Sequence, residues 1–166
     1  MYNRSMKSSI AAFKYGARKE YGRYYAAELA KKHESWIKKT GAQALIPVPI
    51  HKERHKKRGY NQAKVIADYL EGETGIPVID DYLIRIKNTE ALKELSAAER
   101  KASLEDAFLV SETSKLLYRK LRCVILVDDI YTTGSTINEC AATLKKSGVL
   151  KVYFLCACIG KDQGGE

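Results

Sequence analysis

The chain has 166 residues, a length typical of one domain that can bury a full hydrophobic core. Hydrophobic residues make up 45% and charged residues 30%, which excludes a disordered or a membrane-embedded chain. The net charge is +9, with 16 basic and 4 acidic side chains in residues 1–64 against 13 and 16 in the remainder. This asymmetry favours an anionic partner: a nucleotide, a sugar phosphate or a nucleic-acid backbone.

Targeting and cross-linking signals are missing from the sequence. No apolar run reaches the roughly 18 residues of a spanning helix, and the polar residues 1–9 lack the apolar core of a signal peptide. The four cysteines include no Cys-x-x-Cys pair, so we predict neither a disulfide framework nor a zinc ribbon. We expect a single cytoplasmic domain over residues 1–166, with a frayed tail at 160–166 and no membrane partner.

Hydrophobic periodicity and turn residues predict alternating helices and strands. After a short amphipathic piece that ends at Tyr15, helices are expected over residues 20–39, from an Asn61 cap to about residue 71, after a Ser96–Glu99 capping box, and over residues 136–146. The helix after Asn61 should bury Val65, Ile66, Tyr69 and Leu70. Strands are expected at 44–48, 78–86, 107–110, 123–127 and 150–159, and residues 87–95 as a mobile loop. Strands separated by helices predict an α/β fold with a parallel-rich sheet flanked by helices.

A dense group of cations follows the first predicted strand. Five of the seven residues 52–58 are basic: Lys52, Arg54, Lys56, Lys57 and Arg58. Because the stretch begins just after two prolines, we expect a binding loop there rather than a helix face. His51 and His55 lie in the same stretch and are further candidates to touch an anion.

The most informative segment is residues 124–136, which read Val-Ile-Leu-Val-Asp-Asp-Ile-Tyr-Thr-Thr-Gly-Ser-Thr. We expect a buried strand, a loop over 128–135 and then a helix, and ligands of open α/β sheets bind where strands end in this way. The hydroxyls of Thr132, Thr133, Ser135 and Thr136, the turn at Gly134 and the free amides of the helix would bind a phosphate monoester.

The acid pair Asp128 and Asp129 would repel a phosphate that it faced. Two adjacent carboxylates are better explained as acceptors for neighbouring hydroxyls or as holders of a hydrated Mg²⁺. A ligand that offers both a phosphate and a vicinal diol is a ribose 5-phosphate. The segment is neither a Walker P-loop nor a Gly-x-Gly-x-x-Gly dinucleotide fingerprint.

Residues 124–136 resemble the phosphoribosyl diphosphate (PRPP) signature of type I phosphoribosyltransferases. This resemblance implies that fold for the whole domain, a catalytic role for Asp128 and Asp129 with Mg²⁺ held through water, and a ribose 5-phosphate site formed by Tyr131, Thr132, Thr133, Gly134, Ser135 and Thr136.

A second resemblance is to the ComF family of competence-associated, phosphoribosyltransferase-like proteins. It is carried by Ile-Pro-Val-Pro-Ile-His at residues 46–51, by Arg-Gly-Tyr-Asn-Gln-Ala at 58–63, and by Phe-Lys-Tyr at 13–15. It implies that residues 50–60 meet the diphosphate of PRPP, through Lys52, Arg54, Lys57 and above all Arg58. The chain lacks the four-cysteine zinc segment that begins many members, and Leu92 and Ser103 replace residues common in the family.

The ComF resemblance implies a PRPP-binding protein that serves DNA uptake in natural transformation. The sequence leaves two alternatives open: a phosphoribosyltransferase of nucleobase salvage, and a non-catalytic PRPP or nucleotide sensor that binds single-stranded DNA. Neither the acceptor substrate nor turnover is fixed by the residues. Single-stranded DNA, a competence helicase and a second copy of the chain are the partners that this interpretation admits.

Overall fold

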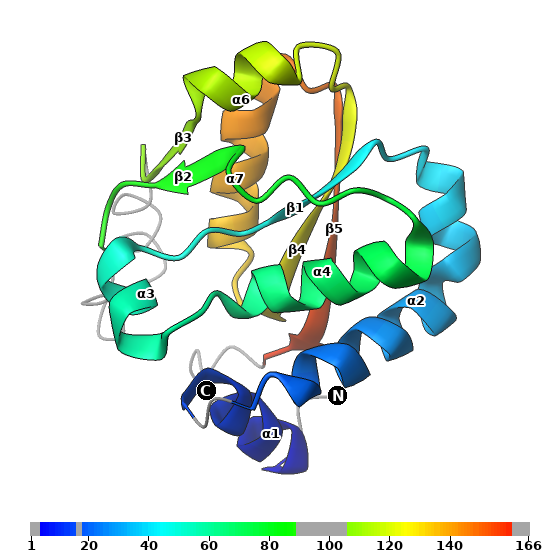
Figure 1. Cartoon of the computed structure of the whole chain (residues 1–166), viewed down its shortest axis with the longest axis vertical. Coiled ribbons are helices and arrows are strands. Elements are labelled where there is room, and N and C mark those ends of the chain that lie inside the picture. The colour runs from blue at the N-terminus through cyan, green and yellow to red at the C-terminus, as the bar shows by residue number, and fades with distance from the viewer. Residues whose placement is uncertain (1–3, 16–17, 89–105, 161–166) are drawn as a thin grey trace, which may run out of the picture.

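The computed structural model describes residues 4–15, 18–88 and 106–160 (Figure 1). In this part of the chain the helices are α1 (Arg4–Tyr15), α2 (Glu20–Thr40), α3 (Lys52–Arg58), α4 (Gln62–Thr74), α6 (Glu112–Leu117) and α7 (Ser135–Lys146). The strands are β1 (Ala44–Pro47), β2 (Leu83–Arg85), β3 (Phe108–Val110), β4 (Cys123–Tyr131) and β5 (Lys151–Ile159). None of the described helices is both long and apolar enough to cross a membrane.

The main sheet is parallel, as the alternation of strands and helices predicts. Its strand order is β1-β4-β5, and Val78 adds a parallel bridge beside Leu45 on the outer side of β1. Strands β2 and β3 pair antiparallel in a separate two-stranded sheet. The central strand β4 begins with five buried residues, as expected for a strand covered on both faces.

Helices cover both faces of the main sheet and bury two hydrophobic clusters. Side chains alternate along each strand, so Leu45, Ile125 and Val127 face α1, α2 and α4, whereas Ile46, Val124 and Leu126 face α7 and the β2–β3 pair. Figure 1 shows α4 crossing one face of the sheet and α7 lying on the other. The predicted α/β fold with a parallel sheet between helices is confirmed.

Caps fix several of the predicted boundaries. The Asn61 side chain accepts a hydrogen bond from the Ala63 amide, which begins α4, and donates one to the Val48 carbonyl at 3.0 Å. These two bonds tie the start of α4 to the end of β1. The same helix buries Ile66 and Leu70 as predicted, but Tyr69 is 40% exposed, so its predicted burial is wrong.

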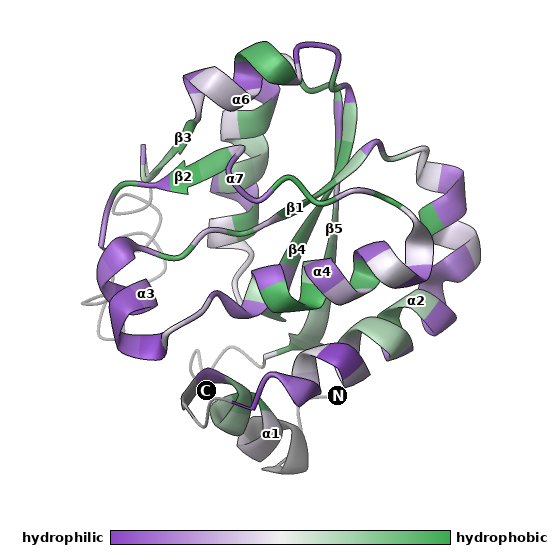
Figure 2. Cartoon of the chain, in the orientation of Figure 1, coloured by the Kyte–Doolittle hydropathy of each residue, from purple (hydrophilic) through white to green (hydrophobic). Residues whose placement is uncertain are grey.

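The prediction of a loop at the cations of residues 52–58 is also wrong, because this stretch is helix α3. His51 caps it by accepting a hydrogen bond from the Glu53 amide, and Gly59 ends it in the left-handed conformation. The helix buries none of its own residues and is hydrophilic throughout (Figure 2). Sequence periodicity therefore gave no sign of it.

Two strand predictions need correction as well. The predicted strand over 78–86 is reduced to the bridge at Val78 and to β2, with irregular backbone between them. Strand β4 is longer than expected, since it continues to Tyr131, and Asp128, Ile130 and Tyr131 still pair with β5. The predicted capping box at 96–99, most of the 87–95 loop, Leu92 and Ser103 lie outside the described residues.

Candidate functional site

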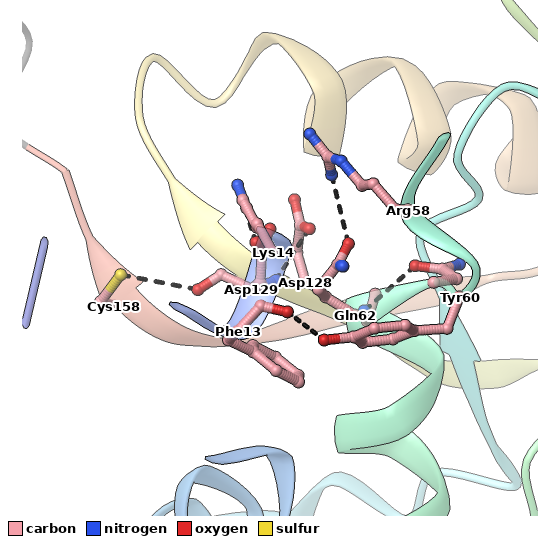
Figure 3. Close-up of polar contacts among 10 residues, drawn as sticks. Phe13, Lys14, Arg58, Tyr60, Gln62, Asp128, Asp129 and Cys158 are labelled. Carbon is pink, nitrogen blue, oxygen red and sulfur yellow. Dashed lines mark hydrogen bonds and ion pairs between the residues drawn. The ribbon is translucent and has the colours of Figure 1, made fainter. Parts of the chain in front are cut away.

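The candidate site lies at the carboxyl edge of the parallel sheet. Strand β1 leads into α3, β4 leads through residues 132–134 into α7, and β5 ends at Ile159, all at this edge. The last turn of α1 reaches the same edge, where Lys14 meets the end of β4 (Figure 3). Residues from distant parts of the sequence therefore converge where open α/β sheets bind their ligands.

The turn between β4 and α7 has the features of an anion site. Gly134 has φ 78°, and a Cβ built there would stand 2.5 Å from the Tyr131 hydroxyl oxygen, so the turn is closed around a position without a side chain. The hydroxyls of Thr133 and Ser135 lie 2.9 Å apart, and the Ser135 amide donates to Thr133 Oγ1 at 3.4 Å. Hydroxyls and the first amides of α7 are thus gathered at one point.

The other predicted phosphate residues flank this turn. Tyr131 is the last residue of β4, and its ring stacks on Phe154 with centroids 5.3 Å apart. Thr132 is exposed, and Thr136 is half-buried in the first turn of α7. The structure therefore places the predicted residues 131–136 in one continuous corner.

The two acids of the predicted pair meet different surroundings. The Asp129 carboxylate is 2.8 Å from the Lys14 ammonium, with only 12% of its side chain exposed. Its own amide donates to Asp128 Oδ1 at 2.8 Å. Burial, followed by repulsion from Asp129, raises the pKa of Asp128 well above its usual range. The Lys14 ammonium therefore offsets part of the negative charge of the acid pair, which eases the repulsion of a phosphate.

Two arginines, Arg54 and Arg58, interact electrostatically with a third, Arg85, which also interacts with Asp128. Burial, and then the positive charge of Arg54, lowers the pKa of Arg85, while the charge of Asp128 raises it and that of Arg58 lowers it. The Arg85 guanidinium also lies 5.3 Å from the centre of the Phe108 ring. These guanidinium groups repel one another, and an anion bound among them would relieve that repulsion.

The predicted diphosphate residues separate into two pairs on α3. Arg54 and Arg58, one helical turn apart, are half-buried on the side that interacts with Arg85. Lys52 and Lys57 are exposed. The structure therefore brings the two arginines, and not the two lysines, to the region of the acid pair.

Two hydrogen bonds at this edge tie α3 to α4 and the segment between these helices to α1 (Figure 3). Arg58 donates to the side-chain oxygen of Gln62 at 3.2 Å, and Gln62 is only 1% exposed. The buried Tyr60 hydroxyl donates to the backbone carbonyl of Phe13. Tyr60 is thus a packing residue that joins the segment between α3 and α4 to the end of α1.

Sequence reasoning gave no functional role to Lys14 or Arg85. Lys14 belongs to the amphipathic segment that ends at Tyr15 and to the Phe-Lys-Tyr motif of residues 13–15, and neither pattern predicts a role at the site. Arg85 lies between Ile84 and Ile86 in an apolar run, and that interruption was the one signal available. Both lie far along the chain from residues 124–136, so only the tertiary structure brings them together.

A metal ion would find two carboxylates at this site and few other ligands. No group of three or more His, Cys, Asp and Glu side chains that could hold a metal occurs in the described ranges. Asp128 and Asp129 offer hard oxygen ligands, which suits Mg²⁺ provided that water and ligand phosphates complete its shell. The residues present fit such a partly hydrated ion.

Comparison with known proteins finds relatives that are named competence proteins. Competence protein F of Haemophilus influenzae is 40% identical over 111 residues, which cover 66% of this chain and 47% of that protein. Competence protein ComFC of Bacillus subtilis is 31% identical over 147 residues, covering 89% and 56%. The chain is a relative of the ComF-type competence proteins. The resemblance noted in the sequence is confirmed.

The DNA utilization protein YhgH of Escherichia coli is 32% identical over 114 residues, covering 69% of this chain and 48% of that protein. The chain spans about half the length of the curated relatives it matches. No family model matches it. Among solved structures, the glutamine PRPP amidotransferase of B. subtilis aligns with a TM-score of 0.47 and 21% identity, over 85% of this chain and 26% of that one.

Proposed function

We propose that this chain binds PRPP together with Mg²⁺ at the carboxyl edge of its sheet, as a phosphoribosyltransferase-like protein that serves the uptake or use of DNA. The observation that carries the proposal is the corner at residues 131–136, where hydroxyls and helix amides gather around Gly134 beside an acid pair. The role in DNA uptake is supported by the relatives named competence protein F, ComFC and DNA utilization protein.

Each part of the site suits one part of PRPP. The 5-phosphate would lie against the Thr133 and Ser135 hydroxyls and the first amides of α7, where the helix dipole favours an anion. The ribose diol would then reach the carboxylates of Asp128 and Asp129, which precede the turn on the same strand. The acid pair and the turn follow one another along the chain, and the diol and the phosphate lie at opposite ends of a ribose 5-phosphate, so each end of the ligand can meet its own group.

The diphosphate would be met by cations. Arg54 and Arg58 interact electrostatically with Arg85, which also interacts with Asp128, and a guanidinium group can bind phosphate oxygens through two parallel hydrogen bonds. A Mg²⁺ held by Asp128 and Asp129 would neutralise diphosphate charge and favour its departure. The protein's own contribution is to hold the sugar by its phosphate and diol and to stabilise the leaving anion electrostatically.

The direct test is calorimetric titration of the protein with PRPP and Mg²⁺. We expect binding by the wild-type chain, and a loss of at least tenfold in affinity for Thr133→Ala and for the double variant Asp128→Asn/Asp129→Asn. Thr143→Ala is the matched control, because within the described residues the Thr143 hydroxyl donates its hydrogen bond to the Glu139 carbonyl of its own helix, α7. PRPP binding that survives the site substitutions would refute the site.

A second experiment distinguishes an enzyme from a sensor. Diphosphate release is measured with PRPP, Mg²⁺ and a panel of nucleobases. Release with one base would identify a salvage-type transferase, and binding without release would identify a sensor. DNA binding is tested with single-stranded oligonucleotides at increasing salt, since contacts to the phosphate backbone weaken steeply as salt rises. Absence of binding at low salt would refute DNA contact by this part of the protein.

A further inference from the structure

The end of helix α1 is anchored at the candidate site. The Phe13 side chain is completely buried, and its ring lies 6.0 Å from those of Tyr25 and Tyr60. Its backbone carbonyl accepts the hydrogen bond of the Tyr60 hydroxyl. Side chain and backbone of one residue are therefore both fixed, and this determines where the next residue, Lys14, projects.

Lys14 projects onto Asp129 (Figure 3). Its ammonium lies 2.8 Å from Asp129 Oδ2, with 20% of the lysine side chain exposed. That oxygen is buried, and within the described residues it accepts no hydrogen bond, so the ion pair is its compensation for lost hydration. A buried carboxylate oxygen whose one ion-pair partner here is an ammonium group can also bind a divalent cation in place of that ammonium.

We propose that Lys14 is a resident counter-ion of Asp129, which a divalent cation must displace before it can use that carboxylate. The inference rests on the proposed function only in taking Asp129 as a metal ligand. Its consequence is regulatory: the site stays neutralised by the protein's own lysine until a metal arrives, and the end of α1 is released from β4 when it does.

The physical basis is competition for one oxygen atom. Two cations cannot share a buried oxygen without strong mutual repulsion, so metal binding must include the free energy of displacing the ammonium. Removing the lysine charge abolishes this competition. If the substitution damaged the fold, the metal would bind more weakly, whereas loss of a competing cation makes it bind more tightly. The direction of the change in metal affinity therefore distinguishes a damaged fold from the loss of a competitor.

The test is Mn²⁺ binding to the whole chain, measured by electron paramagnetic resonance without any phosphorylated ligand. We expect Lys14→Met to bind Mn²⁺ about tenfold more tightly than wild type, and Lys14→Arg, which keeps the charge, to bind no more tightly. Lys38→Met is the matched control, because Lys38 also pairs with a carboxylate, Glu34, at 2.6 Å but on an exposed face of α2. It should leave the Mn²⁺ affinity unchanged.

Equal or weaker Mn²⁺ binding by Lys14→Met would overturn the proposal, as would failure of both wild type and Lys14→Met to bind Mn²⁺ at millimolar concentration. If Lys14→Met does not fold, the wild-type chain provides a second measurement. Acylation of Lys14 by an amine reagent, followed by mass spectrometry, should rise severalfold when Mn²⁺ is bound, while acylation of Lys38 stays constant. An unchanged Lys14 yield would overturn the proposal.

This experiment is separate from the test of the proposed function. If the wild-type chain does not bind PRPP, the proposed function is refuted, but the Mn²⁺ result is unaffected. If the wild-type chain binds PRPP but replacing Lys14 does not change the Mn²⁺ affinity, only the proposed counter-ion role of Lys14 is refuted.

Discussion

Replacing Gly134 with alanine probes the corner between β4 and α7 at its tightest point. The backbone there has φ 78°, a region that L-residues adopt at a cost. The new Cβ would also lie 2.5 Å from the Tyr131 hydroxyl oxygen and 3.0 Å from the ring carbon that bears it. Because Tyr131 stacks on Phe154, its ring cannot yield without losing that contact.

The structure gives the expected magnitude. The left-handed backbone costs an alanine about 1–2 kcal/mol, and displacing a packed side chain costs about 1–3 kcal/mol more. Together these costs come to about 2–5 kcal/mol, and a chain of this size loses roughly 2–4 °C in melting temperature per kcal/mol, so we expect a fall of roughly 4–20 °C. PRPP binding should be lost as well, because the displaced ring and turn are those that form the proposed phosphate corner.

The assay is thermal unfolding together with PRPP titration. Gly41→Ala is the matched control, because Gly41 has φ 62° but no atom within 4 Å of the added Cβ, and it lies away from the site at the end of α2. It isolates the backbone cost, about 1–2 kcal/mol, and should leave PRPP binding intact. Equal losses of melting temperature in the two variants, or undiminished PRPP binding by Gly134→Ala, would refute this reasoning.

Three further substitutions test other parts of the site. Arg85→Gln should weaken binding of inorganic diphosphate about tenfold, measured by calorimetry. Arg122→Gln, at the opposite edge of the sheet, should not weaken it. Equal effects of the two substitutions would contradict diphosphate binding by Arg54, Arg58 and Arg85. Tyr60→Phe removes the hydroxyl that bonds the Phe13 carbonyl and should cost about 1–3 kcal/mol in chemical unfolding; an unchanged midpoint would disprove the anchor. Burial, and then repulsion by Asp129, raises the folded-state pKa of Asp128, so folding stability should fall as pH rises from the unfolded value, about 3.9, through the folded one. The melting temperature of Asp128→Asn should therefore rise relative to that of metal-free wild type as the pH increases from 4 to 7, and a constant difference would contradict the raised pKa.

Helix α3 shows why one sequence prediction failed. Residues 52–58 carry five cations and no apolar period, so the usual signal of a helix is missing. The helix forms because His51 and Gly59 cap its two ends. Caps of this kind depend on single residues whose conformation neighbouring segments also decide, and two prolines just upstream suggested a loop instead. The helix decides which of these cations turn inward: Arg54 and Arg58 are half-buried, whereas Lys52 and Lys57 are exposed.

The amino-acid sequence by itself determined the parallel sheet, the buried strand that carries the acid pair, and the turn at Gly134, because hydrophobic runs, caps and glycine turns act through near neighbours in the chain. Tertiary structure alone decided that Lys14 neutralises Asp129 and that Arg85 joins Arg54 and Arg58. These groups come from separate elements, and their meeting depends on how the elements pack. Two charged groups interact when the fold brings them close together, and a local sequence pattern does not predict that proximity.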